Sequence, residues 1–207
     1  MSDAVAPVTS TDAAYFDALF DSADDPWQFR TRWYETRKRA LTLACLPTAR
    51  YGRGYEPGCA NGELTAALAT RCDRLLASDG AERAVALART RLRGLDHVRV
   101  VQAWLPQDWP AGTFDLVVLS ELGYYLDRDA LKSLTRRLLA SLSPNGTVVA
   151  CHWRPPIAGC ALNGDEVHAA LDEQLALSRM CSVVEPDLRM DVWCTDGTSV
   201  AERERLR

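Results

Sequence analysis

The chain has 207 residues, of which 47% are hydrophobic and 25% charged, a composition typical of one soluble globular domain. Its formal net charge of -4 argues against a general binder of nucleic acid or anionic membranes, because both surfaces select a positive excess. The seven cysteines include no C-x-x-C pair and no histidine at zinc spacing, so we expect reduced thiols and no metal site. The N-terminus lacks the pattern of a secretory signal and the longest uncharged stretch is too short to span a bilayer, so we expect a cytoplasmic protein.

The N-terminal part of the chain predicts two helices. Apolar side chains at Phe16, Leu19 and Phe20 recur at helical spacing before the break at Asp24-Asp25-Pro26. A second helix over about Trp33–Leu46 should end before the proline at position 47. We expect residues 1–46 to form a helical cap or lid.

After residue 47, strand patterns alternate with helix patterns. The expected strands are Tyr51–Glu56, Arg74–Ser78, Val98–Gln102, Phe114–Ser120, Thr147–His152, Leu177–Glu185 and Leu188–Cys194. The expected helices are Gly62–Arg71, Ala81–Gly94, Asp129–Ser141 and Asp165–Gln174, and the polar residues 201–207 are expected to fray. This alternation predicts a doubly wound α/β fold with a mostly parallel seven-stranded sheet, in which the last two strands form an antiparallel edge hairpin.

The same pattern predicts one domain over residues 1–207. In it, residues 47–152 form the cofactor-binding core, and residues 153–207 complete the sheet and help to shape an acceptor pocket. Sheets of this kind bind ligands at the carboxyl ends of their strands, beside the first strand.

One loop carries the first functional signal: Glu56-Pro57-Gly58-Cys59-Ala60-Asn61-Gly62 joins a strand to a helix. Glycines suit a loop where a ligand approaches the backbone, and the first turn of the following helix adds N–H donors. Asp79 ends the next apolar strand, where a carboxylate can accept both hydroxyls of an adenosine ribose. A plain turn followed by a helix cap at Asp79 is the alternative interpretation.

With these features the sequence resembles the class I S-adenosylmethionine-dependent methyltransferases. The matching residues are Glu56-x-Gly58-x-x-x-Gly62, Asp79, Phe114–Glu121 and Leu142–Thr147. Within that superfamily the chain is more similar to the nodulation N-methyltransferase (NodS-like) branch, in Asp25–Trp27, Tyr34-Glu35, Glu56–Cys59 and Ser120–Leu126. The resemblance implies the cofactor S-adenosyl-L-methionine, the product S-adenosyl-L-homocysteine, no metal, and N-methylation of a small acceptor, an amino sugar or chitooligosaccharide.

The resemblance also implies which residues bind the cofactor: Glu56, Gly58, Cys59, Gly62, Asp79, Gly80, Trp104, Leu105 and Ser120. Gly58 and Gly62 would admit the methionyl part, Glu56 would hold its amino group, and Asp79 would bind the ribose. Ala60 departs from a frequent glycine, which is tolerable if its φ is negative. Trp104 replaces the usual aspartate that accepts from the adenine amino group; because indole offers no acceptor, Trp104 either stacks on adenine or belongs to the core.

Transfer of a methyl group from a sulfonium depends mainly on positioning, but an amine acceptor must arrive unprotonated. A carboxylate or imidazole near the methyl group can take the proton of the amine. Glu121, which follows the buried fourth strand, is therefore our first catalytic candidate, and His152 is the second, with a structural role as its alternative. The candidate acceptor contacts are Trp33, Tyr34, Glu121, Tyr124, Tyr125, Trp153 and Arg154, with helix packing as the alternative for the two adjacent tyrosines. We expect His168 on a surface helix.

Three other functions remain open at the level of sequence. The first is O- or N-methylation of another small metabolite. The second is a nicotinamide-dependent dehydrogenase, although the tight Gly-x-Gly-x-x-Gly fingerprint is missing. The third is a non-catalytic regulator that binds S-adenosylmethionine, which Trp104 keeps open. The sequence gives no prediction of the oligomeric state.

Overall fold

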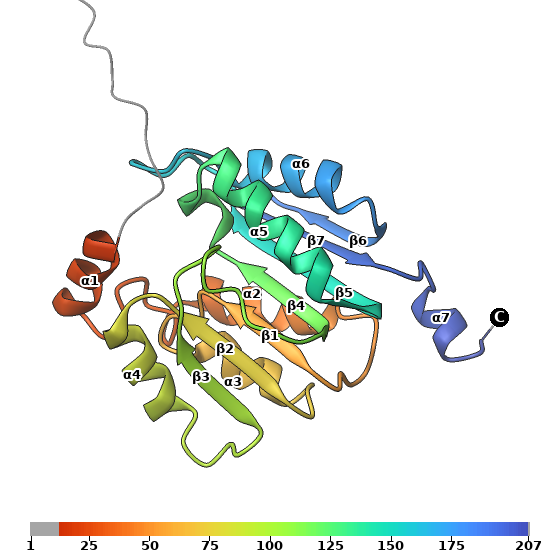
Figure 1. Ribbon diagram of the computed structural model, residues 1–207, viewed down its shortest axis with the longest axis horizontal. Coiled ribbons are helices and arrows are strands. Elements are labelled where there is room, and N and C mark those ends of the chain that lie inside the picture. Colours follow the sequence, from red (N-terminus) through yellow and green to blue (C-terminus); the bar gives the residue numbers. More distant parts are fainter. Residues whose placement is uncertain (1–12, 207) are drawn as a thin grey trace, which may run out of the picture.

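The computed structural model describes residues 13–206 and contains one seven-stranded sheet, with the strand order β3-β2-β1-β4-β5-β7-β6 (Figure 1). The strands are β1 (Gly54–Pro57), β2 (Leu75–Asp79), β3 (Val98–Gln102), β4 (Phe114–Ser120), β5 (Leu142–Trp153), β6 (Ser178–Val184) and β7 (Leu188–Cys194). The first five strands pair in parallel, whereas β7 runs antiparallel to both β5 and β6. The predicted doubly wound sheet with an antiparallel edge hairpin is therefore confirmed.

The helices connect the strands and cover both faces of the sheet (Figure 1). They are α1 (Ala13–Ser22), α2 (Trp33–Ala44), α3 (Glu63–Ala69), α4 (Glu82–Arg91), α5 (Arg128–Ser141), α6 (Gly164–Leu175) and α7 (Val200–Arg203), with a short 3-10 helix η1 (Gly123–Tyr125). Helix α7 was not predicted; its N-terminus is closed by a capping box between Ser199 and Glu202. The first strand is shorter than predicted, because Tyr51 forms only an isolated bridge to Cys72.

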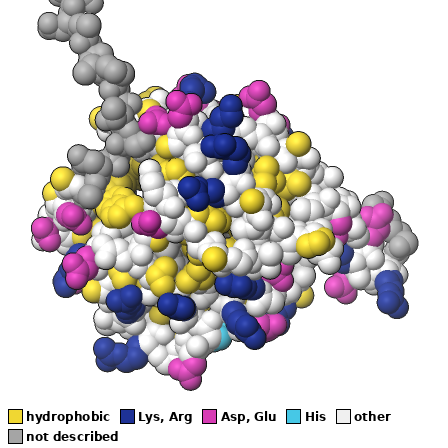
Figure 2. Space-filling model, in the orientation of Figure 1, with side chains coloured by type: hydrophobic (Ala, Val, Ile, Leu, Met, Phe, Trp, Pro, Cys, Tyr) yellow, Lys and Arg dark blue, Asp and Glu magenta, His cyan; other side chains and the backbone are white. Residues whose placement is uncertain are grey.

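Acidic and basic side chains are interspersed on the face of the molecule drawn in Figure 2, which presents no continuous basic patch. No helix among residues 13–206 is both long enough and apolar enough to cross a membrane.

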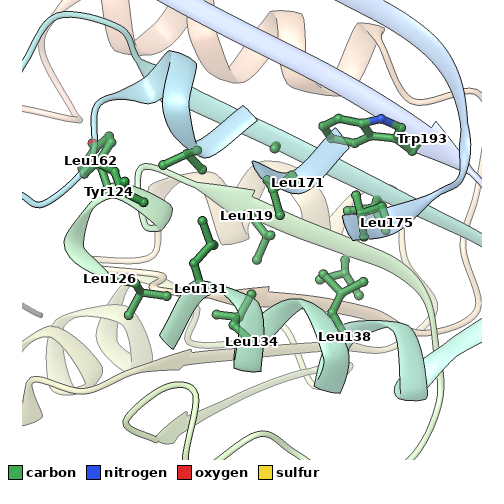
Figure 3. Close-up of a cluster of buried hydrophobic side chains, with 14 of the residues drawn as sticks. Leu119, Tyr124, Leu126, Leu131, Leu134, Leu138, Leu162, Leu171, Leu175 and Trp193 are labelled. Atoms are coloured by element: carbon green, nitrogen blue, oxygen red, sulfur yellow. The ribbon is translucent and has the colours of Figure 1, made fainter. Parts of the chain in front are cut away.

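Strand β4 explains how the two faces are packed. Val117 and Leu119 point to the side covered by α5 and α6, whereas Leu116 and Val118 point to the side of α2 and α3. On the first side, leucines of α5 meet Leu119 and the α6 leucines 171 and 175 (Figure 3). Because both faces of β4 are buried, its sequence is an unbroken apolar run, and the polar residues that follow it emerge together at its carboxyl end.

Candidate functional site

A cavity of about 780 Å³ opens at the carboxyl ends of β1, β2 and β4. Side chains of α1 and α2 form its outer wall, and the loop after β1 forms its floor. Asp25 ties the outer wall to that loop, because its Oδ1 atom accepts from the Phe29 backbone N–H at 2.8 Å and from Asn61 Nδ2 at 2.9 Å. The cavity lies at the edge of the sheet where the sequence predicted a ligand site.

Glu56 is a buried acid on the wall of this cavity, with 2% of its surface exposed. Its Oε2 atom has no hydrogen-bond partner among the described residues, and burial raises the pKa of its carboxyl group to about 8. The neighbouring Gly58 has a φ of 72°, and a Cβ there would lie 3.3 Å from Leu122. A buried carboxyl group with one such oxygen atom, beside a glycine of this conformation, is suited to receive a cationic group from the cavity.

Asp79 also lines the cavity, at the end of β2. Its two carboxylate oxygens accept from the backbone N–H groups of Ala60 at 2.9 Å and Ala81 at 3.1 Å, and burial raises its pKa. Because a carboxylate has about four acceptor positions, it can still receive hydroxyl donors from a ligand. Ala60 itself has a φ of 47°, so the condition of a negative φ, under which alanine would be tolerated here without strain, is not met, and the left-handed conformation costs about 1 kcal/mol.

Gly62 does not line the cavity, contrary to its predicted contact with the cofactor. It precedes α3 with a φ of 83°, and a Cβ at this position would lie 3.1 Å from the Cα of Ala88 in α4. Gly62 therefore allows the loop to turn and α3 and α4 to approach each other, and acts on the cavity only through the loop.

Trp104 lies on the cavity wall and rests flat against Gly80. A Cβ on Gly80 would be 2.7 Å from three atoms of the indole, so only glycine permits this contact. The ring centroid of Phe16 lies 6.4 Å from that of Trp104, which brings α1 over the same part of the cavity. The remaining predicted cofactor residues Cys59, Leu105 and Ser120 also line the cavity.

Glu121 lies on the cavity wall, at the carboxyl end of β4, and is bound from three sides. Its Oε1 accepts from Lys38 Nζ at 2.6 Å, and its Oε2 accepts from the Trp153 backbone N–H at 2.9 Å and from the Tyr124 hydroxyl. Its φ of 55° places it in the left-handed region, which is uncommon for a residue other than glycine.

Lys38 is a functional candidate that the sequence analysis did not single out. It is 5% exposed, lines the cavity and lies between Glu121 and Glu35, whose Oε2 is 3.0 Å from Nζ. Burial alone would lower the pKa of Lys38. The negative charges of Glu121 and Glu35 outweigh this effect, so the pKa of Lys38 lies above its ordinary value. One available signal was its rarity, since the only other lysine in the chain is Lys132.

The predicted aromatic acceptor contacts Tyr34, Tyr124, Tyr125 and Trp153 all line the cavity. The rings of Tyr34 and Trp153 meet edge to face with centroids 5.6 Å apart, and the Phe16 ring packs against Tyr125 at 4.9 Å. These side chains give the cavity an aromatic wall that also carries tyrosine hydroxyl groups.

Two predicted acceptor contacts lie elsewhere. Trp33 is 74% exposed, because neighbouring residues of a helix point about 100° apart and Tyr34 takes the direction of the cavity. Arg154 donates to Asp165 at 2.9 Å and to the Glu185 carbonyl, and lies outside the cavity. Neither residue lines the cavity, because the direction of a side chain depends on the register of its helix or strand.

Two of the histidines, His152 and His168, lie outside the cavity, and His152 has the structural surroundings given above as its alternative. His152 is fully buried and does not line the cavity, since alternation along β5 turns Trp153 toward α2 and His152 toward α6. His152 therefore cannot contact an acceptor in this conformation. His168 was expected on the surface, but it is fully buried against His152.

The family profile and the similar sequences that match this chain carry the same description. The profile of the family described as nodulation protein S (NodS) matches residues 18–187. Nodulation protein S from Sinorhizobium fredii is 32% identical to this chain over 130 residues, which cover 62% of this chain and 60% of that protein. The match thus spans less than two thirds of that relative's length.

Two crystal structures extend this comparison. That of a candidate methyltransferase from Pseudomonas syringae is 55% identical, covers 79% of this chain and 99% of its own, and superposes with a TM-score of 0.72. That of the N-methyltransferase NodS from Bradyrhizobium japonicum, in complex with S-adenosyl-L-homocysteine, is 26% identical, covers 88% of this chain and 97% of its own, and has a TM-score of 0.79.

Proposed function

Because this chain belongs to the nodulation protein S family of S-adenosylmethionine-dependent methyltransferases, we propose that it transfers a methyl group from S-adenosylmethionine to a nitrogen atom of a small acceptor. The acceptor class that we propose is an amino sugar or chitooligosaccharide. The observation that carries the proposal is that Glu56, Asp79 and Glu121, which end three neighbouring strands, line one cavity.

The residues of the cavity fit the cofactor. The unpaired Oε2 atom of Glu56 suits the ammonium of a methionyl group, and the free acceptor positions of Asp79 suit the hydroxyls of a ribose. The exposed face of the Trp104 indole offers a flat surface for a purine. When bound, S-adenosylmethionine supplies an electrophilic methyl group on a sulfonium.

Glu121 is proposed to take the proton of the acceptor amine. Three of the roughly four acceptor positions of its carboxylate are used by Lys38, Tyr124 and Trp153, which leaves one for an N–H of the acceptor. Lys38 holds the carboxylate in this position, because its Nζ forms an ion pair of 2.6 Å with Oε1 of Glu121. Glu121 thereby helps the amine to attack in its neutral form.

The aromatic wall supports a sugar acceptor. Tyr34 and Trp153, whose rings meet on the cavity wall, can pack against the apolar face of a sugar ring. In this proposal the N-terminal helices cap the cofactor, and the segment after His152 shapes the acceptor pocket. The carboxylates Glu35 and Glu121 outnumber Lys38, so the group as a whole favours a basic acceptor over an acidic one.

Mass spectrometry of the reaction product tests the proposal. We expect a chitooligosaccharide with a free amine to gain one methyl group in the presence of the protein and S-adenosylmethionine. The fully N-acetylated oligosaccharide is the matched control, because it has no basic amine, and Glu121→Gln should bind the cofactor but lose turnover.

Other outcomes would replace the proposal. Methylation of the N-acetylated control would indicate an oxygen acceptor. Calorimetric binding of S-adenosylmethionine, with no turnover on amino sugars or on a panel of amines, would favour the non-catalytic regulator.

A further inference from the structure

Three fully buried side chains form a hydrogen-bonded chain outside the cavity. The backbone N–H of Gly123 donates to His152 Nε2 at 3.0 Å, His152 Nδ1 lies 3.1 Å from His168 Nε2, and His168 Nδ1 lies 2.6 Å from Asp191 Oδ2. These residues come from η1, β5, α6 and β7, so the chain runs from the edge hairpin of the sheet to the turn that follows Glu121.

The backbone amide fixes the position of every proton in this chain. Because an N–H can only donate, His152 Nε2 must be the acceptor, so a neutral His152 carries its hydrogen on Nδ1 and donates it to His168. His168 then accepts at Nε2 and donates from Nδ1 to Asp191. Burial lowers the pKa of both imidazoles, which agrees with two neutral rings.

This series of hydrogen bonds ends beside Glu121, whose backbone has an unfavourable conformation. The carboxyl end of β5 makes three successive contacts with the segment after β4: the Cys151 carbonyl accepts from Glu121 N at 2.8 Å, His152 accepts from Gly123, and Trp153 N donates to the Glu121 carboxylate. A left-handed φ at a glutamate persists only where the surrounding structure imposes it.

Gly123 cannot be replaced by a larger residue in this arrangement. A Cβ on Gly123 would lie 2.4 Å from Val167 Cγ1 and 3.1 Å from His152 Nε2. The turn at Gly123 is therefore packed tightly between Val167 of α6 and His152 of β5. Tyr124, which donates to Glu121, follows directly, so displacement of Gly123 would move both the carboxylate and its donor.

We infer that Asp191, His168 and His152 are positioning residues that hold Gly123 and thereby keep the Glu121 carboxylate directed into the cavity. This inference rests on the proposed function for its effect on turnover. The assignment of the protons does not, because it follows from the hydrogen bonds alone.

The nitrogen NMR spectrum of the imidazoles tests the assignment in the unmodified protein. The chain has three histidines, and the third, His97, lies with Nε2 3.0 Å from the Ala69 carbonyl, which requires the opposite tautomer with the hydrogen on Nε2. We expect His152 and His168 to be neutral with hydrogen on Nδ1 at pH 7, and His97 to differ from both when neutral. A hydrogen on His152 Nε2, or a doubly protonated His152, would overturn the inference.

Two variants of His152 test the positioning role. The amide oxygen of His152→Gln can accept from Gly123, whereas His152→Leu offers no acceptor. We expect kcat to fall by about 10- to 100-fold in His152→Leu and less in His152→Gln, with the Kd for S-adenosylmethionine unchanged in both. His97→Leu and His97→Gln are the matched controls and should keep the kcat of the unmodified protein.

The outcomes separate the inference from the proposed function. Equal losses of kcat in the two His152 variants, or no loss in His152→Leu, would overturn the positioning role. If the unmodified protein transfers no methyl group, the proposed function fails, and the NMR spectrum still decides whether the hydrogen-bonded chain exists. If His152→Leu does not fold, the comparison passes to His152→Gln against His97→Gln, where a loss of kcat of about 10- to 100-fold in His152→Gln alone would contradict the role, because its amide still accepts from Gly123.

Discussion

The Nζ atom of Lys38 lies 2.6 Å from Oε1 of Glu121, although the two residues come from the N-terminal cap and from the end of the fourth strand. This contact joins helix α2 to the predicted catalytic carboxylate. It also places a buried cation between the half-buried Glu121 and the buried Glu35, which lies on the other side of Lys38. The cap of the cavity is therefore part of the electrostatics of the site.

Replacement of Lys38 by methionine should destabilise the protein in a pH-dependent way. The change leaves Glu35 and Glu121 without their cation, and removal of one partner of a buried pair costs about 3–5 kcal/mol. Without Lys38 the folded state favours protonated carboxyl groups, so the loss should be smaller at pH 5 than at pH 8. Urea unfolding at the two pH values measures the difference.

Lys132→Met is the matched control for Lys38→Met. Lys132 is exposed on α5 and is the only other lysine, so its replacement should change the free energy of unfolding by less than about 0.5 kcal/mol. A loss of stability in Lys38→Met that does not depend on pH would contradict the role given to the two carboxylates. Turnover should fall in Lys38→Met and persist in Lys132→Met.

Residues at the ends of strands were predictable from the sequence, whereas residues that depend on side-chain direction were not. Glu56 and Asp79 lie at the carboxyl ends of β1 and β2, Glu121 directly follows β4, and parallel strands end at the same edge of a sheet. The direction of the His152 side chain depends instead on the alternation of side chains along β5. Trp153 faces the cavity, whereas His152, one residue earlier, faces the core.

The contact between Lys38 and Glu121 was beyond prediction for another reason. It joins residues 83 positions apart through the placement of α2, and no local pattern encodes such a distance. The left-handed conformations of Ala60 and Glu121 were also unpredictable, because neither residue type favours them and tertiary contacts impose them.

Replacement of Asp79 by alanine should weaken the binding of S-adenosylmethionine. The variant loses the carboxylate that faces the cavity, and loss of charged hydrogen bonds costs about 1–3 kcal/mol of binding free energy. Calorimetric titration measures the Kd. Asp96→Ala, on an exposed loop, is the control and should bind as the unmodified protein does; an unchanged Kd in Asp79→Ala would remove Asp79 from the ribose site.

Replacement of Gly80 by alanine should act through Trp104. The added methyl group would lie 2.7 Å from the indole, so the ring must move into the cavity, and we expect the Kd for S-adenosylmethionine to rise at least about tenfold, or about 1.4 kcal/mol. The double variant Gly80→Ala/Trp104→Leu relieves the clash. Its affinity should equal that of Trp104→Leu alone, and additive losses in this double-mutant cycle would show that the glycine acts independently of the indole.

Replacement of Glu56 by glutamine should change stability and binding in opposite directions. Burial raises the pKa of Glu56 from 4.5 to about 8, so the folded apoprotein retains a proton that the unfolded chain releases. The stability contributed by this proton is present below pH 4.5 and is lost as the pH rises through 8. Glutamine is neutral at every pH, and Glu56→Gln should therefore unfold at higher urea concentration than the unmodified apoprotein at pH 8.5, with little difference at pH 5.

Bound S-adenosylmethionine should reverse this order of stability between Glu56→Gln and the unmodified protein. The ionised Glu56 is suited to a cationic amino group, so Glu56→Gln should bind S-adenosylmethionine more weakly by about 1–3 kcal/mol at pH 8. Saturating cofactor should then stabilise the unmodified protein more than the variant, because ligand that binds only the folded state adds its binding free energy to stability. A variant that gains apoprotein stability but keeps its affinity would mean that Glu56 is buried for another reason and does not contact the cofactor.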